Sequence, residues 1–248
     1  MAAKPLVDLS FGPYVARVDR DIPHQSNAMA LRATCFRDGA SDRDRFDPLC
    51  WHGLVTGPGA VPLVAFRLRL ASGSLLGSTY TGAFYDLSPL AAIGGPFLEI
   101  GRFCHAPGRC DPMALRLAWA AIGQLVDHHG VKMLIGCSSL PGSDPADHTA
   151  ILATLRRDHV GPDTLRPRRT SPRAVDLPCL DIPRAALPAL LRSYLAMGGW
   201  VSDHAVQDPD LDTLHLFTGL QVATIPARRK HRLRALAQDA SRHARSDT

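Results

Sequence analysis

Short stretches of alternating apolar and polar residues run along the chain and predict a series of strands. The clearest are 14–19, 63–70 and 97–105, with further strands at 53–56, 132–138, 213–218 and 221–225. Apolar positions at helical spacing predict helices at 26–36, 112–129, about 144–159 and 184–197. Residues 161–183 contain several prolines and arginines and fit neither pattern, which predicts a long surface loop. Because helices and strands are interleaved, we expect an α/β domain around a mixed sheet.

The excess positive charge is concentrated at the C-terminal end of the chain. Residues 227–248 contain seven arginine or lysine residues and two aspartates, which accounts for the whole formal net charge of +5. Residues 1–226 are therefore neutral overall. We expect 1–226 to form a single domain followed by a basic tail at 227–248, and a basic segment of this kind favours acidic partners.

Several classes of protein are disfavoured by what the sequence lacks. It has no stretch of about 18 uncharged apolar residues, and its first residues form no apolar signal core, so we expect a cytoplasmic protein. The six cysteines are scattered and match no zinc spacing, so we expect reduced thiols and no metal site. Motifs for phosphate binding, dinucleotide binding and serine hydrolysis are missing. Aromatic residues make up only 6% of the chain, which argues against a nucleic-acid partner.

Charged residues interrupt two of the apolar strands. Glu99 and Arg102 lie in the strand predicted at 97–105, and Arg67 lies in an earlier one. An unpaired charge in a central strand is costly, so each of these side chains needs a partner or a polar cleft. A twist or bulge near Gly101 would bring Glu99 and Arg102 closer together. The alternative is that these side chains face solvent from a half-exposed sheet.

A set of short motifs, in order along the chain, carries a family resemblance. The motifs are Leu31-Arg-Ala-Thr-Cys-Phe36, Asp44-Arg-Phe-Asp47-Pro48 with Cys50-Trp-His52, Val64-Ala-Phe-Arg67-Leu, Leu98-Glu-Ile-Gly-Arg-Phe-Cys104, Gly136-Cys-Ser-Ser-Leu-Pro-Gly-Ser-Asp-Pro145, Gly199-Trp-Val and the segment 208–218. Over about residues 14–230, the chain resembles the acyl-carrier-protein-dependent branch of the GCN5-related N-acyltransferases. It is similar to the ornithine N-acyltransferases of bacterial ornithine-lipid synthesis and, more distantly, to the acyl-homoserine-lactone synthases. The resemblance implies the GNAT fold, an α/β fold whose mixed, mostly antiparallel central sheet is flanked by helices.

The same resemblance bears on the acyl donor. The general fold uses a glycine-containing loop whose amides bind a pyrophosphate at a helix N-terminus. Here the loop at 108–113 lacks the second small residue of that pattern, which argues against coenzyme A. The implied donor is therefore an acyl group on the phosphopantetheine arm of acyl carrier protein, with no separate cofactor.

The resemblance also implies roles for individual residues. An amine attacks an acyl thioester, so a base must take the amine proton, and Glu99 is the candidate. Arg102 would orient Asp44 and Asp47 or the substrate, and these two carboxylates would help to hold an ammonium group. Arg67 would bind these acids or a substrate carboxylate, and the serines at 138 and 139 would bind the pantetheine amides. The full set of implied substrate-binding residues is Arg32, Phe36, Asp44, Asp47, Arg67, Ser138 and Ser139. The alternative for the charged members of this set is an ion-pair network that anchors a loop.

The implied reaction moves a 3-hydroxy fatty acyl group to the α-amino group of ornithine and gives lyso-ornithine lipid. Ornithine, lysine and glutamine suit the charges about equally, so another amino acid, or synthesis of a homoserine-lactone signal, is an alternative. A different alternative is a module that binds acyl carrier protein or lipid without catalysis. The joint presence of the charged motif residues favours an enzyme.

Two basic clusters, at 166–173 and 228–234, suit an acidic carrier protein. The second cluster also contains leucine, so it could lie on an anionic membrane, at the inner face, where a lipid product would leave. The alternative for this end of the chain is a solvated basic terminus.

Overall fold

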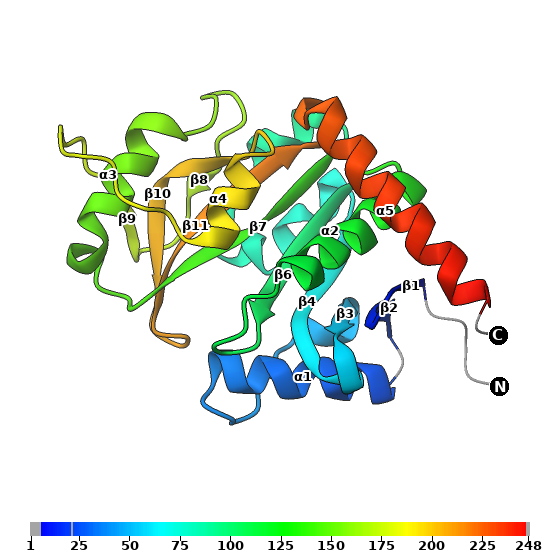
Figure 1. The fold of residues 1–248 in the computed structure, drawn as a ribbon. Coiled ribbons are helices and arrows are strands. Elements are labelled where there is room, and N and C mark those ends of the chain that lie inside the picture. Colours follow the sequence, from blue (N-terminus) through cyan, green and yellow to red (C-terminus); the bar gives the residue numbers. More distant parts are fainter. Residues whose placement is uncertain (1–5, 21, 247–248) are drawn as a thin grey trace. The chain divides into compact units, whose positions relative to one another are not determined.

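The structure is a computed structural model that describes residues 6–20 and 22–246, which divide into two compact units. The first unit contains residues 1–69, 100–131 and 227–248, and the second contains 70–99 and 132–226. Strands β4 (Pro62–Ala71) and β6 (Phe97–His105) contribute residues to both units. Each unit combines strands with helices that pack on them (Figure 1).

In the first unit the strand order is β1-β2-β3-β4-β6, and β1 to β4 pair antiparallel. Its other elements are β1 (Val7–Phe11), β2 (Tyr14–Asp19), α1 (Ile22–Phe36), a 3₁₀ turn (Asp47–Leu49), β3 (Trp51–Thr56), α2 (Pro112–His128) and α5 (Ala227–Ser246). Helix α1 packs on β3 and β4 through Leu31, Leu54 and Ala65. Helix α2 contacts β1, β2 and β3, and α5 contacts β1 and α2.

The best-defined helix of the sequence, α2, has clear signals at both ends. Asp111 caps it by accepting hydrogen bonds from the backbone N–H groups of Met113 at 2.8 Å and Ala114 at 3.1 Å. After its last turn, Gly130 adopts a left-handed φ of +60°, which ends the helix. The helix predicted at 112–129 is therefore confirmed, as are the strands predicted at 14–19 and 97–105.

In the second unit the strand order is β6-β7-β11-β10-β9, and β7, β11, β10 and β9 pair antiparallel. Its elements are β7 (Met133–Pro141), α3 (Thr149–Asp158), β9 (Ala174–Asp176), α4 (Ala189–Leu195), β10 (Trp200–Asp208) and β11 (Thr213–Gln221), with the separate pair β5 (Tyr85–Asp86) and β8 (Arg168–Arg169). The 3₁₀ turns of this unit are Gly73–Ser78, Thr81–Ala83, Ser88–Ile93, Pro145–His148 and Val222–Thr224, and the first unit has a further one at Pro58–Ala60. Leu152 of α3 and Leu191 of α4 pack on one face of β10 and β11. Leu76, Tyr85 and Leu90 pack with Phe217 of β11 in a second cluster.

Three predicted elements differ from the structure. The helix predicted at about 144–159 is divided into the 3₁₀ turn Pro145–His148 and α3. The helix predicted at 184–197 is confined to α4, because Pro188 directly precedes Ala189 and disfavours helical backbone at the residue before it. The strand predicted at 221–225 is wrong, because β11 continues to Gln221 and the chain then forms a 3₁₀ turn. Strands β1, β5, β8, β9 and β10 were not predicted.

The basic segment at the C-terminal end forms α5, which was not predicted as a helix. Ala237 and Ala240 are buried, Arg234 pairs with Asp127 of α2 at 2.7 Å, and Ser241 accepts a hydrogen bond from Gln124. This segment therefore packs against the first unit along much of its length, and the side chains of residues 242–248 lie outside the described part of the chain. Among the described residues, none of the helices combines the length and the apolar character needed to cross a membrane.

Candidate functional site

The loop between α1 and β3 is held by buried ion pairs in the first unit. Arg32 on α1 is fully buried and donates from Nε to Asp42 Oδ2 at 2.9 Å and from Nη1 to Asp47 Oδ1 at 2.7 Å. Its Nη2 donates to the backbone carbonyl of Asp42 at 2.9 Å. Arg32 therefore fixes two points of the loop to the helix.

Two arginines on strands complete this set. Arg67 on β4 donates from Nη1 to both carboxylate oxygens of Asp44 at 2.7 Å and to Asp47 Oδ1 at 2.9 Å. Arg102 on β6 donates from Nε to Asp42 at 3.1 and 3.2 Å, and from Nη2 to Asp44 at 3.5 Å. We call these six side chains, from three arginines and three aspartates, the arginine–aspartate cluster. Their formal charges cancel.

The arginine–aspartate cluster keeps its groups ionised although it is buried. Burial alone would raise the pKa of the Asp47 carboxyl, but the hydrogen bond and charge of Arg32 and the charge of Arg67 outweigh burial and lower that pKa. Burial likewise opposes the charged form of Arg67, but the neighbouring Asp44 raises its pKa. The guanidinium and carboxylate groups of the cluster therefore stabilise one another in their charged forms.

The pleat of β6 is broken at Arg102. This residue has a φ of +49°, in the left-handed region that residues other than glycine rarely adopt. A Cβ atom on Gly101 would lie 3.1 Å from Arg67 Nε, so Gly101 and Arg102 both face the arginine–aspartate cluster instead of alternating. The distortion predicted near Gly101 is present, and it directs Arg102 to Asp42. Phe36 lies beneath Arg102, with 5.6 Å between the guanidinium carbon and the ring centre.

The structure thus brings together most of the charged residues singled out in the sequence, and it adds Asp42. Asp42 was missed because it lies in a loop rich in Asp and Arg, where no spacing distinguishes one acid from another. These contacts match the alternative named for the charged residues, an ion-pair network that anchors a loop. The substrate-binding roles of these residues stay predictions, and Asp44 is the most exposed of the three aspartates, at 22% of its side chain.

Glu99 lies in the second unit, where its carboxylate faces the start of a 3₁₀ turn. Its Oε1 accepts hydrogen bonds from the backbone N–H and the hydroxyl of Thr81, both at 2.7 Å. Its Oε2 accepts a bond from the backbone N–H of Tyr80 at 3.2 Å. Only 3% of Glu99 is exposed, and all three donors are neutral groups.

The side chain of Tyr80 links Glu99 to a second buried carboxylate. The Tyr80 hydroxyl donates to Asp208 Oδ2 at 3.2 Å, and Asp208 is 5% exposed at the end of β10. The other oxygen of Asp208 accepts bonds from the backbone N–H groups of Asp210 and Leu211 at the hairpin tip. Within the described residues, neither Glu99 nor Asp208 forms an ion pair with an arginine, lysine or histidine.

Buried aromatic and imidazole rings extend this polar region. Phe84 contacts the rings of Tyr80 and His215, with centroid distances of 5.1 and 4.7 Å. Burial lowers the pKa of His215 to about 4, although the charge of Asp208 opposes this effect. His215 is therefore neutral near pH 7. The hydroxyl of Tyr85 donates to the backbone carbonyl of His215 at 2.9 Å.

Ser138 and Ser139 are consecutive residues of β7, so their side chains lie on opposite faces of the sheet. The Ser138 hydroxyl is 2.7 Å from that of Thr218, and Ser139 is exposed opposite His215. The two serines therefore cannot face one ligand from the same side. Tyr80, Thr81 and Asp208 were not among the predicted site residues, because their contacts with one another and with Glu99 depend on the tertiary fold.

Comparison with known proteins adds to this geometry. Residues 27–120 match the model of the acetyltransferase (GNAT) domain, and this range includes both the arginine–aspartate cluster and Glu99. The chain is 32% identical to an L-ornithine N(alpha)-acyltransferase from Rhodobacter capsulatus over 94% of its own length and 96% of that protein. The chain belongs to the L-ornithine N(alpha)-acyltransferase family. A second member of this family, from Rhizobium meliloti, is 29% identical over 75% of the chain and 69% of that protein.

The resemblance to the ornithine N-acyltransferases is thereby confirmed, as is the GNAT fold with a mixed, mostly antiparallel sheet flanked by helices. Among solved structures, an N-acyl amino acid synthase from uncultured soil microbes covers 85% of the chain and 90% of that protein, at 10% identity and a TM-score of 0.47.

Proposed function

We propose that this chain transfers a fatty acyl group from a thioester to the α-amino group of ornithine and so forms lyso-ornithine lipid. The named relatives are ornithine acyltransferases, and the similarity to the Rhodobacter capsulatus protein extends over nearly the whole of both chains. The range that matches the GNAT domain includes Glu99, the residue proposed as the base.

The observation that carries the proposal is the pair of buried carboxylates in the second unit. Glu99 and Asp208 are 3% and 5% exposed, they are connected through Tyr80, and neither has a cationic partner in the described part of the chain. Buried charges in proteins are normally paired. Ornithine carries two ammonium groups, so a bound ornithine would supply the missing positive charge.

In the proposed reaction, the α-ammonium group first gives one proton to solvent. The neutral amine nitrogen then attacks the carbonyl carbon of the thioester, a C–N bond forms, and the C–S bond breaks. Glu99 takes the proton that the amine loses, and the departing thiolate then takes up that proton. Each carboxylate oxygen has two lone pairs, so Oε2 of Glu99, which accepts from Tyr80, keeps one for the amine.

Asp208 is the proposed partner of the side-chain ammonium group. The neighbouring His215 is neutral near pH 7 and therefore adds no competing positive charge. Asp44 and Asp47, which the motifs suggested for an ammonium group, are already matched by arginines within their cluster. A carboxylate without such a partner is a better match for a cationic substrate.

The proposed donor is a 3-hydroxy fatty acyl group on the phosphopantetheine arm of acyl carrier protein, and no further cofactor is needed because the thioester is already activated. The reduced loop at 108–113 supports a donor without a pyrophosphate. Arg228 and Arg232 are exposed on α5 and offer positive charge to an acidic carrier protein. The alternative partner for this charge is the inner face of an anionic membrane.

The test is to incubate the purified chain with 3-hydroxyacyl carrier protein and separate amino acids, and to detect N-acyl products by mass spectrometry. Ornithine should be the best acceptor. Norvaline, which has the same carbon chain without the side-chain amine, should be a poor one. A product formed only with another amino acid or as a lactone, or no product with any amine, would reject the ornithine assignment. Acyl-coenzyme A in place of the carrier-bound thioester tests the donor.

Two variants test the carboxylates separately. Glu99→Gln should lower kcat by about 10²-fold or more, because the base is lost. Asp208→Asn should raise the KM for ornithine and reduce the preference for ornithine over norvaline. Asp210→Asn is the matched control, because it removes an exposed carboxylate from the same hairpin. Equal kinetics of Asp208→Asn and the control would remove Asp208 from substrate recognition.

A further inference from the structure

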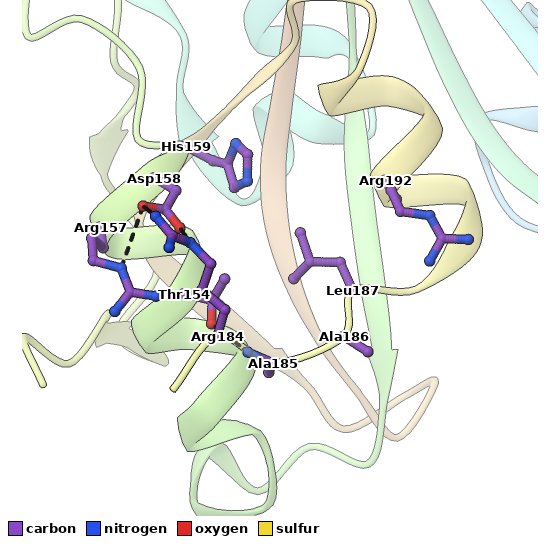
Figure 2. Close-up of a pocket in the computed structure, with 9 residues that line it drawn as sticks. All are labelled: Thr154, Arg157, Asp158, His159, Arg184, Ala185, Ala186, Leu187 and Arg192. Carbon is purple, nitrogen blue, oxygen red and sulfur yellow. Dashed lines mark hydrogen bonds and ion pairs between the residues drawn. The ribbon is translucent and has the colours of Figure 1, made fainter. Parts of the chain in front are cut away.

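A cavity of about 700 Å³ lies in the second unit, at the C-terminal end of α3 (Figure 2). It is lined by Thr154, Arg157, Asp158, His159, Arg184, Ala185, Ala186, Leu187 and Arg192. These residues come from α3, from the segment that precedes α4, and from α4 itself. The proposed acyl transfer uses none of them.

The cavity has an excess of positive charge. Asp158 accepts hydrogen bonds from Arg184 at 2.8 and 3.1 Å and from Arg157 at 3.3 Å, so two arginines share one carboxylate. Arg192 is exposed on α4 and has no ion-pair partner among the described residues. With three arginines and one aspartate, the lining carries a formal charge of +2.

The rest of the lining is apolar or neutral. Ala185, Ala186 and Leu187 form a hydrophobic stretch next to the arginines, and Figure 2 shows the Leu187 side chain between Arg192 and the Asp158–Arg184 pair. Burial lowers the pKa of His159, so its imidazole is neutral near pH 7 and can donate or accept a hydrogen bond. Charged and apolar side chains within one cavity suit a ligand that has both characters.

We propose that this cavity binds a phosphate group attached to a short hydrocarbon portion, with the arginines of its lining supplying positive charge to the phosphate and Leu187 and its neighbouring alanines against the hydrocarbon. Guanidinium groups bind phosphate oxygens through paired hydrogen bonds, and Arg192 has its donors available. A volume of about 700 Å³ exceeds what a phosphate alone needs and is in the range of sites for organic ligands. The phosphate belongs either to a lipid headgroup or to a small soluble phosphate ester, for which inorganic phosphate is the simplest probe.

Isothermal titration calorimetry of the full chain distinguishes these sources. The probes are inorganic phosphate, dihexanoyl phosphatidic acid below its micelle concentration, and dihexanoyl phosphatidylcholine as a probe of the same chain length without net charge. We expect phosphatidic acid to bind more tightly than phosphatidylcholine, and its binding to weaken as salt is added. Competition by inorganic phosphate would support a shared phosphate site, and preference for phosphatidic acid would identify a lipid headgroup. Absence of binding by both phosphate probes would overturn the proposal.

Variants assign the binding to the cavity. Arg192→Gln should weaken phosphatidic acid binding about tenfold, because one charged hydrogen-bonding group is lost. Arg156→Gln is the matched control, since Arg156 is exposed on the same helix as Arg157 but does not line the cavity. Thermal unfolding would serve as the control that both variants are folded. Equal affinities of Arg192→Gln and Arg156→Gln would overturn the assignment whether or not the chain acylates ornithine.

Discussion

Arg32 offers the sharpest test of what the arginine–aspartate cluster does. Replacing it by methionine keeps a long, flexible side chain but removes its hydrogen bonds to Asp42 and Asp47, the shortest of which is 2.7 Å. Removing one partner of a buried ion pair costs about 3–5 kcal/mol, because the other charge stays buried. Asp42 retains Arg102 and Asp47 retains Arg67, so we expect a loss near 3 kcal/mol.

This loss is large against the total stability of a typical domain, about 5–15 kcal/mol. Urea unfolding followed by circular dichroism would measure it as a lower midpoint with an unchanged slope. Arg17→Met is the matched control: Arg17 pairs with Asp8 at 3.3 Å, and 56% of its side chain is exposed. Exposed pairs contribute about 0–1 kcal/mol, so the control should change little.

A double-mutant cycle between Arg32→Met and Asp47→Asn separates the pair from the rest of the cluster. Because the two side chains are in direct contact, their coupling energy should be at least about 1 kcal/mol. If Arg32→Met costs less than about 1 kcal/mol and the coupling energy is close to zero, the cluster does not anchor the loop. Its charges would then be available for a substrate, as the motifs first suggested.

Three further predictions concern His215, Gly101 and two arginines of α5. The pKa of His215 is about 4 in the folded chain and near 6.5 in the unfolded chain. The unfolded chain therefore binds the proton first as the pH falls, and the free energy of unfolding should drop by about 3 kcal/mol between pH 6.5 and 4. His215→Asn should flatten that dependence in urea titrations, and an unchanged slope would contradict the cause given. Gly101→Ala should cost about 1–3 kcal/mol, because its Cβ would lie 3.1 Å from Arg67 Nε, and a variant as stable as the parent would show that the neighbours adjust freely. Replacing Arg228 and Arg232 together by glutamine should leave the melting temperature unchanged but weaken carrier-protein or vesicle binding, more so at low salt, and unchanged binding would remove α5 as a docking surface.

Elements with strong local signals were predicted well. Helix α2 has a proline in its first turn and a glycine after its end, and β6 matches the predicted bounds because its apolar run is uninterrupted except by Glu99 and Arg102. Strand β10 was missed because serine, aspartate and histidine follow Val201 and disrupt the pattern. Helix α5 was missed because its charged residues obscure the apolar face that packs on α2 and β1.

The candidate site was predictable in part, from charged residues that interrupt apolar strands and from the motifs that carry the family resemblance. Glu99, Arg67 and Arg102 are conspicuous because they interrupt apolar strands, whereas no spacing distinguishes Asp42 from the other acids of its loop. Tyr80 and Asp208 are separated by 128 residues, and no spacing in the sequence connects them. The contact of Thr81 with Glu99 also depends on a 3₁₀ turn, which has no strong sequence signal.

The two units use buried charge in opposite ways, and this difference guides the assignment of roles. In the arginine–aspartate cluster every carboxylate contacts at least one arginine, so burial is compensated without a ligand. Among the described residues, the groups that donate hydrogen bonds to Glu99 and Asp208 are all neutral. Glu99 is also the only glutamate among 23 acidic residues, so every other acidic position uses the shorter aspartate. If the carboxylate must reach an amine, Glu99→Asp, which keeps the charge but shortens the side chain by one methylene, should lower kcat while binding of the acyl donor is retained. A variant with full turnover would show that charge alone, and not reach, determines the role of Glu99.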